Sequence, residues 1–179
     1  MRVITGSARG RKLETLFGEE VTRPTTESTK EAIFSMIQFE IEDRDVLDLF
    51  AGSGQLGIEA LSRGARHCTF VENNRAALKI VESNVKRCGF ENASSAVFAD
   101  ALSFLMRQGS FDIAFLDPPY NKGLIEKSLP LLIPKMNDDG IIVCEYSSSE
   151  AMPEEIDGWR ADRVRRYGKT TVSLYRKER

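Results

Sequence analysis

The chain has 179 residues, 41% of them hydrophobic, and a formal net charge of −2. This length and composition are enough for one domain, residues 1–179, with a sizeable core that needs no disulfides. Three cysteines in apolar or helical contexts and a single histidine argue against a disulfide framework and against a bound metal. No signal peptide, lipidation motif or apolar run of membrane-spanning length occurs, so we expect a cytoplasmic protein.

The first 40 residues predict a basic, strand-like arm followed by a helix over residues 26–39. Residues 1–12 have a local charge of +4 and residues 160–179 have +6, which leaves −12 for the rest of the chain. If the two ends meet in space, they form one basic face suited to a phosphate backbone. The simpler alternative is that each end is a solvated edge. We expect RNA phosphates to bind the arm at Arg9, Arg11 and Lys12.

The remaining residues, 41–179, predict a catalytic core of alternating strands and helices. Strands are expected over residues 46–50, 68–72, 96–99, 111–116 and 140–146. Helices are expected over residues 55–64, 74–88, 101–108 and 123–136. A tight turn at Asp138-Asp139-Gly140 should precede the fifth strand, and residues 160–167 and 170–176 should form a hairpin. This pattern indicates an α/β fold, a parallel sheet with helices on both faces, whose ligands bind at the carboxyl ends of the strands.

A glycine-rich turn follows the first of these strands. Gly52, Gly54 and Gly57 satisfy G-x-G-x-x-G, and Glu72 lies 20 residues beyond Gly52 at the end of the second strand. This spacing suits either a nicotinamide cofactor or S-adenosylmethionine. Asp48 favours S-adenosylmethionine, because a carboxylate beside the turn repels a pyrophosphate and attracts the ammonium group of a methionine moiety.

Two further acids end predicted strands and extend this site. Glu72 can accept hydrogen bonds from two ribose hydroxyls, and Asp100 can accept one from the adenine amine. Each acid could instead be a helix N-cap or a solvated charge. Because all of them fall at successive strand ends, we expect one cleft to hold them together.

The tetrapeptide Asp117-Pro118-Pro119-Tyr120 directly follows the apolar run of residues 111–116. Asp117 precedes a proline and is therefore extended, so its carboxylate can accept a hydrogen bond from an amine. The prolines stiffen the loop and offer only carbonyl acceptors. Tyr120 offers a stacking face for a base, worth about 1–3 kcal/mol. The loop predicts methylation of an exocyclic base amine, and the alternative is a proline turn that only caps a buried strand.

The chain resembles the RsmD-type 16S ribosomal RNA guanine-N2 methyltransferases from end to end. The resemblance rests on Met1-Arg2-Val3-Ile4, Gly10-Arg11-Lys12-Leu13, Arg23-Pro24-Thr25-Thr26, Glu31, Phe34, Asp48 to Gly57, Glu72-Asn73, Asp100-Ala101, Asp117 to Tyr120 and Tyr167-Gly168-Lys169-Thr170. It implies a Rossmann-like class I S-adenosylmethionine-dependent methyltransferase with a seven-stranded, mostly parallel sheet whose last strand is antiparallel.

The same resemblance implies the substrate and completes the expected site. The substrate would be the N2 amine of a guanine in small-subunit (16S) ribosomal RNA, free or within an assembling ribosomal particle. The catalytic loop would be Asp117, Pro118, Pro119 and Tyr120, and Arg23 would join the substrate-binding arm. The cofactor site would comprise Asp48, Ala51, Gly52, Gly54, Glu72, Asn73, Asp100 and Ala101, with no metal.

Two rival classes of function stay open at this point. A DNA adenine or cytosine amino methyltransferase can carry the same tetrapeptide, but the chain has no extra segment large enough for a sequence-reading domain. A related variant of this first class would methylate a protein glutamine amide, but it would leave the basic ends without a purpose. A nicotinamide-dependent oxidoreductase or a non-catalytic nucleotide-binding module fits the glycine turn, but Asp48 and the proline loop disfavour both.

Overall fold

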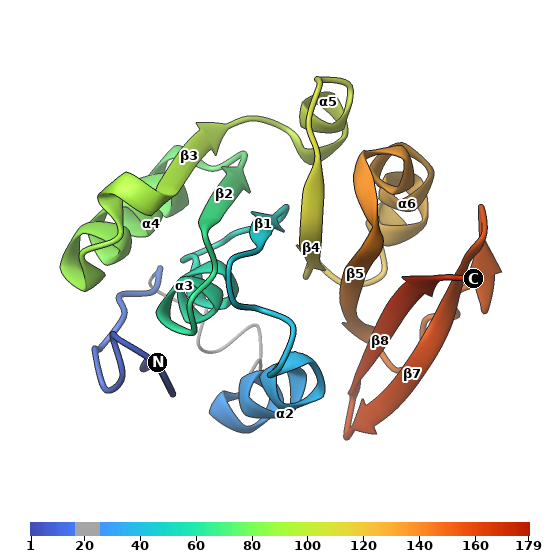
Figure 1. Cartoon of the computed structure of the whole chain (residues 1–179), viewed down its shortest axis with the longest axis horizontal. Coiled ribbons are helices and arrows are strands. Elements are labelled where there is room, and N and C mark those ends of the chain that lie inside the picture. The colour runs from blue at the N-terminus through green and yellow to red at the C-terminus, as the bar shows by residue number, and fades with distance from the viewer. Residues whose placement is uncertain (17–25) are drawn as a thin grey trace.

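A computed structural model of the chain describes residues 1–16 and 26–179, and its centre is one twisted sheet (Figure 1). Five strands run parallel: β1 (Asp45–Asp48), β2 (His67–Glu72), β3 (Ser94–Phe98), β4 (Phe111–Leu116) and β5 (Met136–Ser147). The last strand, β8 (Thr170–Lys177), is antiparallel to both β5 and β7 (Trp159–Tyr167). The predicted mostly parallel sheet with an antiparallel last strand is therefore confirmed.

The predicted number of seven strands is wrong for the described residues, which form eight in the order β3-β2-β1-β4-β5-β8-β7-β6. The additional strand, β6 (Glu155–Ile156), pairs with β7 only through Glu155 to Arg160 and Ile156 to Trp159. A two-residue strand has no hydrophobic period, so no sequence pattern could have indicated it.

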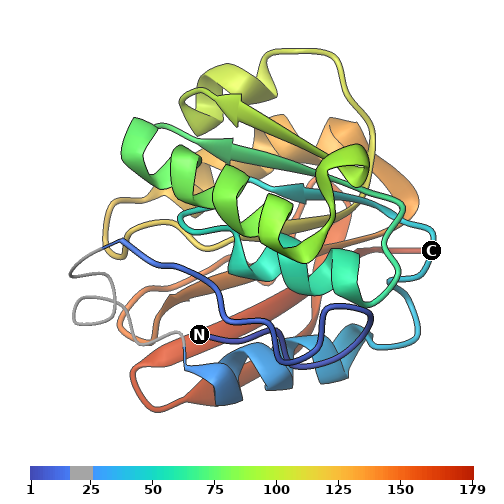
Figure 2. The ribbon, with the colours of Figure 1, turned by 90° about the vertical axis from the view of Figure 1, so that its left-hand side faces the viewer.

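Helices cover both faces of the sheet, as predicted (Figures 1 and 2). One face is covered by α2 (Glu27–Ile37), α3 (Gln55–Ser62) and α4 (Arg75–Cys88), and the other by α5 (Ala101–Leu105) and α6 (Leu124–Leu132). Two short 3-10 turns, Glu91–Ala93 and Ile133–Lys135, complete the helical elements of the described residues. In residues 1–16 and 26–179, no helix has the length and apolar character needed to cross a membrane.

Polar caps set the ends of two of these helices. The hydroxyl of Thr26 accepts the Thr29 N–H at 3.2 Å and starts α2. The side-chain amide oxygen of Asn74 accepts the Ala77 N–H at 3.0 Å and starts α4, which is followed by Gly89 with φ at 77°. Capping side chains satisfy N–H groups that have no partner within the helix, so these boundaries follow from the local sequence.

The N-terminal arm, residues 1–16, is held to the core by buried charged groups. Glu59 of α3 is fully buried and accepts the backbone N–H groups of Ile4 at 2.9 Å and Thr5 at 3.0 Å. Lys30 of α2, also fully buried, donates to the Arg2 carbonyl at 2.8 Å and lies 3.4 Å from the Glu59 carboxylate. Burial lowers the pKa of Lys30 although the Glu59 charge opposes this shift. The sequence predicts a strand-like arm, and the structure has one isolated β-bridge there, between residues 2 and 12.

The turn predicted at residues 138–140 is wrong, because these residues lie inside β5. Between Phe111 and Ile113, β4 advances two residues, whereas the paired positions on β5 advance five, from Met136 to Ile141. The extra residues form a bulge, and a Cβ atom at Gly140 would lie 2.8 Å from the Asn137 carbonyl oxygen. Gly140 therefore marks a place where two backbone segments approach closely. In the sequence, a glycine at such a bulge cannot be distinguished from a glycine in a turn.

Candidate active site

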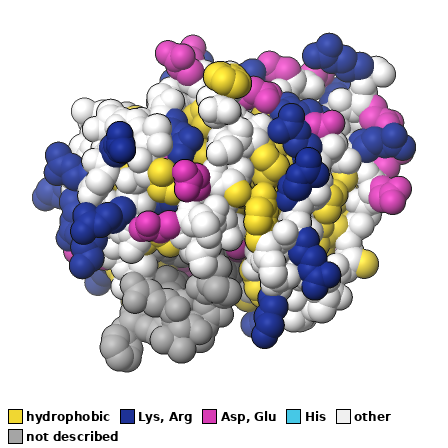
Figure 3. Space-filling model, turned by 90° about the horizontal axis from the view of Figure 1, so that it is seen from below, with side chains coloured by type: hydrophobic (Ala, Val, Ile, Leu, Met, Phe, Trp, Pro, Cys, Tyr) yellow, Lys and Arg dark blue, Asp and Glu magenta, His cyan; other side chains and the backbone are white. Residues whose placement is uncertain are grey.

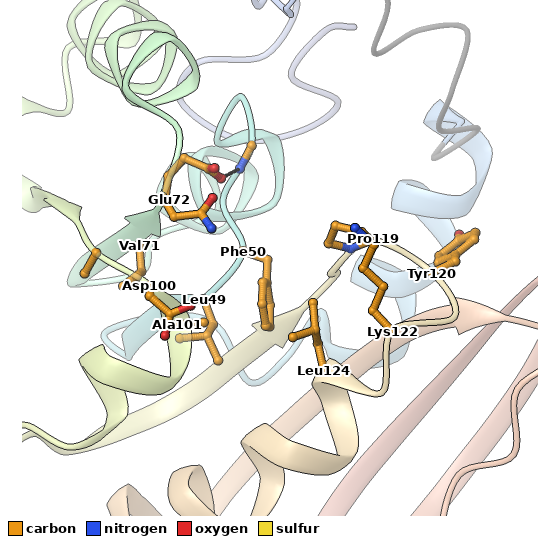
Figure 4. A pocket seen from close by; sticks show the side chains of 13 residues that line it. Leu49, Phe50, Val71, Glu72, Asp100, Ala101, Pro119, Tyr120, Lys122 and Leu124 are labelled. Atoms are coloured by element: carbon orange, nitrogen blue, oxygen red, sulfur yellow. Dashed lines mark hydrogen bonds between the residues drawn. The ribbon is translucent and has the colours of Figure 1, made fainter.

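A cavity of about 500 Å³ opens at the carboxyl ends of β1, β2 and β4 (Figure 4). This is the edge of the sheet at which the sequence predicts ligands, and the volume is in the range of small-molecule sites. The cavity is lined by Leu49, Phe50, Gly52, Val71, Glu72, Asn73, Ala99, Asp100, Ala101, Pro119, Tyr120, Lys122 and Leu124.

Seven of the predicted site residues meet in this lining. They come from the glycine turn, from the ends of β2 and β3 with the start of α5, and from the loop after β4; they are Gly52, Glu72, Asn73, Asp100, Ala101, Pro119 and Tyr120. Figure 4 shows Glu72 and Tyr120 at opposite ends of the cavity. Five of the predicted cofactor residues and two residues of the predicted catalytic loop therefore share one cleft, whereas Asp117 and Pro118 are not among the residues that line it.

Glu72 links the end of β2 to the glycine turn. One carboxylate oxygen accepts the Gly52 N–H at 2.8 Å, and the other accepts the Asn74 N–H at 3.1 Å. Gly52 has φ at 57°, a left-handed conformation that glycine adopts without strain. Each carboxylate oxygen has a second lone-pair direction, so Glu72 can hold the turn and still accept a hydrogen bond from a ligand.

The position of Asp100 is compatible with both of the roles that the sequence left open. Its carboxylate accepts the Ser103 N–H at 3.0 Å and caps α5, and it also lines the cavity. A helix N-cap and a ligand-facing acid are therefore compatible at this position, because the second oxygen lies outside the capping bond.

Asp48, Ala51 and Gly54 are not among the residues that line the cavity. Asp48 is 1% exposed, and its carboxylate accepts the Gly57 N–H at 3.0 Å. Gly54 has φ at 84° and is the residue from which α3 starts. Asp48 therefore holds the glycine turn from behind, whereas Ala51 and Gly54 belong to the turn itself and lead into the helix.

The proline loop divides into a buried and an accessible part. Asp117, which directly follows β4, is 6% exposed, and Pro118 is also buried. Pro119 is exposed and Tyr120 is half-buried, and both face the cavity. The Tyr120 hydroxyl lies 3.1 Å from the hydroxyl of Thr170, the first residue of β8.

The sequence prediction missed six residues of the lining. Four of them are apolar neighbours of predicted positions, namely Leu49, Phe50, Val71 and Ala99, and their place at strand ends could have indicated them. The other two, Lys122 and Leu124, lie in the loop before α6 and at its start, where no periodic pattern exists.

The predicted substrate residues of the arm are exposed at the surface, and Arg23 lies outside the described residues. The Arg11 guanidinium donates to the Arg87 carbonyl of α4 at 3.4 Å. Three residues further along the arm, the Glu14 N–H donates at 2.8 Å to the buried side chain of Asn84 in α4, which itself donates to the Ser53 carbonyl at 2.9 Å. One amide group therefore joins the arm to the glycine turn.

The basic ends of the chain have different partners among the described residues. The arm contacts α2, α3 and α4, whereas Arg176 of the hairpin binds Glu40, three residues after the end of α2, at 2.6 and 2.7 Å. Figure 3 shows the Lys and Arg side chains in a left-hand and a right-hand group. Lys177 and Arg160 are paired with Asp138 and Glu178. The expectation of a single basic surface depends on the two ends meeting in space, and it stays a prediction.

Comparisons with known proteins find full-length relatives. The family model described as Conserved hypothetical protein 95 matches residues 1–176. The chain is 40% identical to YlbH of Bacillus subtilis over 99% of both chains. It is 35% identical to Ribosomal RNA small subunit methyltransferase D of Escherichia coli K12, over 99% of this chain and 90% of that protein.

Solved structures agree with the sequence relatives. Escherichia coli yhhF superposes with a TM-score of 0.90 and 33% identity, covering 99% of this chain and 98% of that one. A Thermus thermophilus 16S rRNA N2 G1207 methyltransferase, solved with AdoMet and guanosine, gives a TM-score of 0.72 at 18% identity over 87% of this chain and 43% of that one. That second likeness concerns the fold alone, and the predicted Rossmann-like class I methyltransferase fold is confirmed.

Proposed function

We propose that this chain, which belongs to the RsmD family of methyltransferases, methylates the N2 amine of a guanine in small-subunit ribosomal RNA. The enzyme class and the cofactor follow from the family: the chain is an S-adenosylmethionine-dependent methyltransferase, as the sequence predicts. One observation carries the proposal within this structure. A single cavity holds Glu72 and Asp100 at the strand ends together with Pro119 and Tyr120 of the proline loop.

The residues of the cavity fit the cofactor. Carboxylates of Glu72 and Asp100 can accept hydrogen bonds from ribose hydroxyls and from an amine, and Leu49, Phe50 and Val71 offer an apolar surface for an adenine ring. When bound, S-adenosylmethionine supplies a methyl group on a positively charged sulfur that carries its own leaving group. We assign cofactor binding to Gly52, Glu72, Asn73, Asp100 and Ala101.

The proline loop would present the base. We assign Asp117 the orientation of the N2 amine through a hydrogen bond to its carboxylate, and the Pro118 backbone carbonyl a second acceptor. Because Asp117 is 6% exposed, little water competes for its carboxylate. Tyr120 would stack on the guanine. The contribution of these residues is alignment of the amine with the methyl group.

Asp48 has a supporting role in this assignment. Its position behind the cavity lining and its bond to the Gly57 N–H support a function in holding the glycine turn. The contact with a ligand ammonium that the sequence predicts for Asp48 stays a prediction. The same holds for Ala51 and Gly54, which lie on the turn but not in the lining.

The nature of the substrate follows from the chemistry of guanine. A paired guanine has its N2 amine inside the helix, so the target should be an unpaired or flipped nucleotide. Assembling small subunits offer such nucleotides in a fixed geometry, and we propose them as the substrate in preference to free RNA. A ribosomal substrate would also place the enzyme in the cytoplasm.

Transfer of label tests this proposal directly. The protein is incubated with tritiated S-adenosylmethionine and either under-modified small subunits, free 16S ribosomal RNA, DNA or ribosomal proteins. Digestion to nucleosides should give N2-methylguanosine, with more label from subunits than from free RNA. Label confined to DNA, to protein or to adenine would overturn the proposed substrate.

A further inference from the structure

Tyr120 is joined to a distant part of the chain. Its hydroxyl lies 3.1 Å from the Thr170 hydroxyl, 50 residues further along the sequence. Thr170 is 3% exposed, whereas Tyr120 is half-buried and faces the cavity. The contact therefore holds the accessible ring at its hydroxyl end, where it meets the buried Thr170.

The two partners of this contact differ in how firmly the backbone holds them. Thr170 is the first residue of β8 and pairs with Ser147 of β5 on one side and Tyr167 of β7 on the other. In addition, the Ser148 N–H donates to the Lys169 carbonyl at 2.8 Å. Tyr120 lies in the irregular segment between β4 and α6. The anchor is therefore in the sheet, and the anchored side chain is in a loop.

The hydroxyl of a tyrosine is not needed for stacking, since a phenylalanine ring has the same flat face. A hydrogen bond at the far end of the ring does, however, fix the position of the hydroxyl and with it the rotation about the Cα–Cβ bond. Because a phenolic hydroxyl forms hydrogen bonds close to the plane of its ring, the contact also favours one tilt of the ring. A ring that is already oriented loses less conformational freedom when a base stacks on it, so binding is tighter. The contact with Thr170 thus has a role in substrate binding that its place outside the cavity lining does not reveal.

We propose that Thr170 is a positioning residue that holds Tyr120 in the orientation for base stacking. This inference rests on the proposed function, since it requires a base as the substrate. It makes the tip of the β7–β8 hairpin part of the substrate site, in addition to the loop after β4.

The charges around Tyr120 agree with a nucleotide as the occupant. Lys122 lines the cavity, and Lys169 is exposed in the turn directly before Thr170. In residues 1–16 and 26–179, neither lysine forms an ion pair with an acid. Phosphates on either side of a stacked guanine would meet these cations, whereas a neutral protein amide would not.

A matched pair of substitutions tests the tether. Thr170→Val keeps the shape and removes the hydroxyl, and Thr170→Ser keeps the hydroxyl. We expect Thr170→Val to lower kcat/KM for under-modified small subunits about 5- to 10-fold, the size of one hydrogen bond. Thr170→Ser should stay close to the wild type. The affinity for S-adenosylmethionine, measured by calorimetry, should be the same in all three proteins.

The substitution Tyr120→Phe closes a double-mutant cycle. If the hydroxyl of Thr170 acts through Tyr120, adding Thr170→Val to Tyr120→Phe should cause no further loss. Equal kcat/KM for Thr170→Val and the wild type, or losses that multiply in the double variant, would overturn the tether. If Thr170→Val does not fold, a Tyr120→Phe variant with wild-type kcat/KM would overturn it equally. Absence of transfer to RNA by the wild-type protein would instead overturn the proposed function.

Discussion

Acidic residues occupy both edges of the parallel sheet, but their partners differ. At the amino ends of the strands, Arg44 lies 3.7 Å from the Asp112 carboxylate, and Asp45 binds Arg66 through both of its oxygens. At the carboxyl ends, Glu72 and Asp100 accept backbone N–H groups, and the described residues place no cation against either.

A structural acid and a candidate binding acid differ in the groups that surround them. Cations of the same chain compensate the charges at the amino edge, where no ligand is needed. The acids of the carboxyl edge are oriented by backbone groups and keep acceptor capacity towards a cavity. The type of residue is the same at both edges, so its partners and its edge carry the functional information.

Removal of Asp117 should give the largest effect if the carboxyl edge is the active site. Asp117→Ala should lower kcat on small subunits by about 10²-fold or more, as for loss of a positioned proton acceptor. Calorimetry should find the S-adenosylmethionine affinity nearly intact. Asp45→Ala, a change of the same size at the amino edge, should leave kcat close to the wild-type value. Equal loss of cofactor affinity in Asp117→Ala would move this residue to the cofactor site.

Removal of Glu72 should weaken the cofactor and not the chemical step. Glu72→Ala should weaken the binding free energy of S-adenosylmethionine by about 1.5–3 kcal/mol, the range for hydrogen bonds to a charged group. Glu72→Gln keeps one oxygen that can accept the Gly52 N–H, so its loss should be smaller. If a folded Glu72→Ala protein binds S-adenosylmethionine as the wild type does, Glu72 has no part in the site.

The carboxyl edge could be predicted from the sequence because its signals are local. Strand ends follow from apolar runs, and Glu72 and Asp100 directly follow such runs. The glycine turn has its own spacing, which predicts the position of the cleft without knowledge of the contacts between strands. The same locality explains why Asp48, which also ends a strand, could not be recognised as lying behind the lining.

Contacts between distant segments could not be predicted. Lys30 and Glu59 look like solvated charges on helices, yet both are fully buried and hold the arm. The contact of Tyr120 with Thr170 depends on how β8 inserts beside β5. The different partners of the two basic ends likewise result from packing. Periodicity in a sequence reports which face is buried, but not which segment buries it.

The comparison between charges that are compensated within the chain and charges that are not also applies to the cations at the surface. Arg9 and Lys12 of the arm are exposed, whereas Lys177 is paired with Asp138 at 2.7 Å. If the arm binds RNA, Arg9→Glu with Lys12→Glu should weaken RNA binding and reduce the slope of log affinity against log salt by about 1.4–1.8, from about 0.7–0.9 for each phosphate.

The control for the arm is Lys177→Glu, which reverses a cation whose charge is already compensated. It should change the slope of log affinity against log salt by less than the contribution of one phosphate contact, which is about 0.7–0.9. Binding of S-adenosylmethionine should be unchanged in both variants. A salt slope that falls equally in the arm variant and in Lys177→Glu would contradict a specific RNA contact by the arm.

The smallest effect is expected at the amino edge, on stability and not on activity. Burial of Asp112 acts to raise the pKa of its carboxyl group, but hydrogen bonds from the Asp45 N–H and the Asn137 amide, with the Arg44 charge, hold that pKa below its ordinary value of 3.8. A lowered pKa means that the ionised group stabilises the folded state above pH 3.8, and that this stabilisation is lost as the pH falls through the lower folded-state pKa.

Asp112→Asn should therefore reduce the free energy of unfolding by about 1 kcal/mol at pH 7, and the difference from the wild type should shrink below the ordinary pKa. Urea unfolding at neutral and acidic pH measures both values, with the exposed Asp139→Asn as the control that should change little. A difference that persists undiminished in acid would show that Asp112 acts through packing and not through its charge.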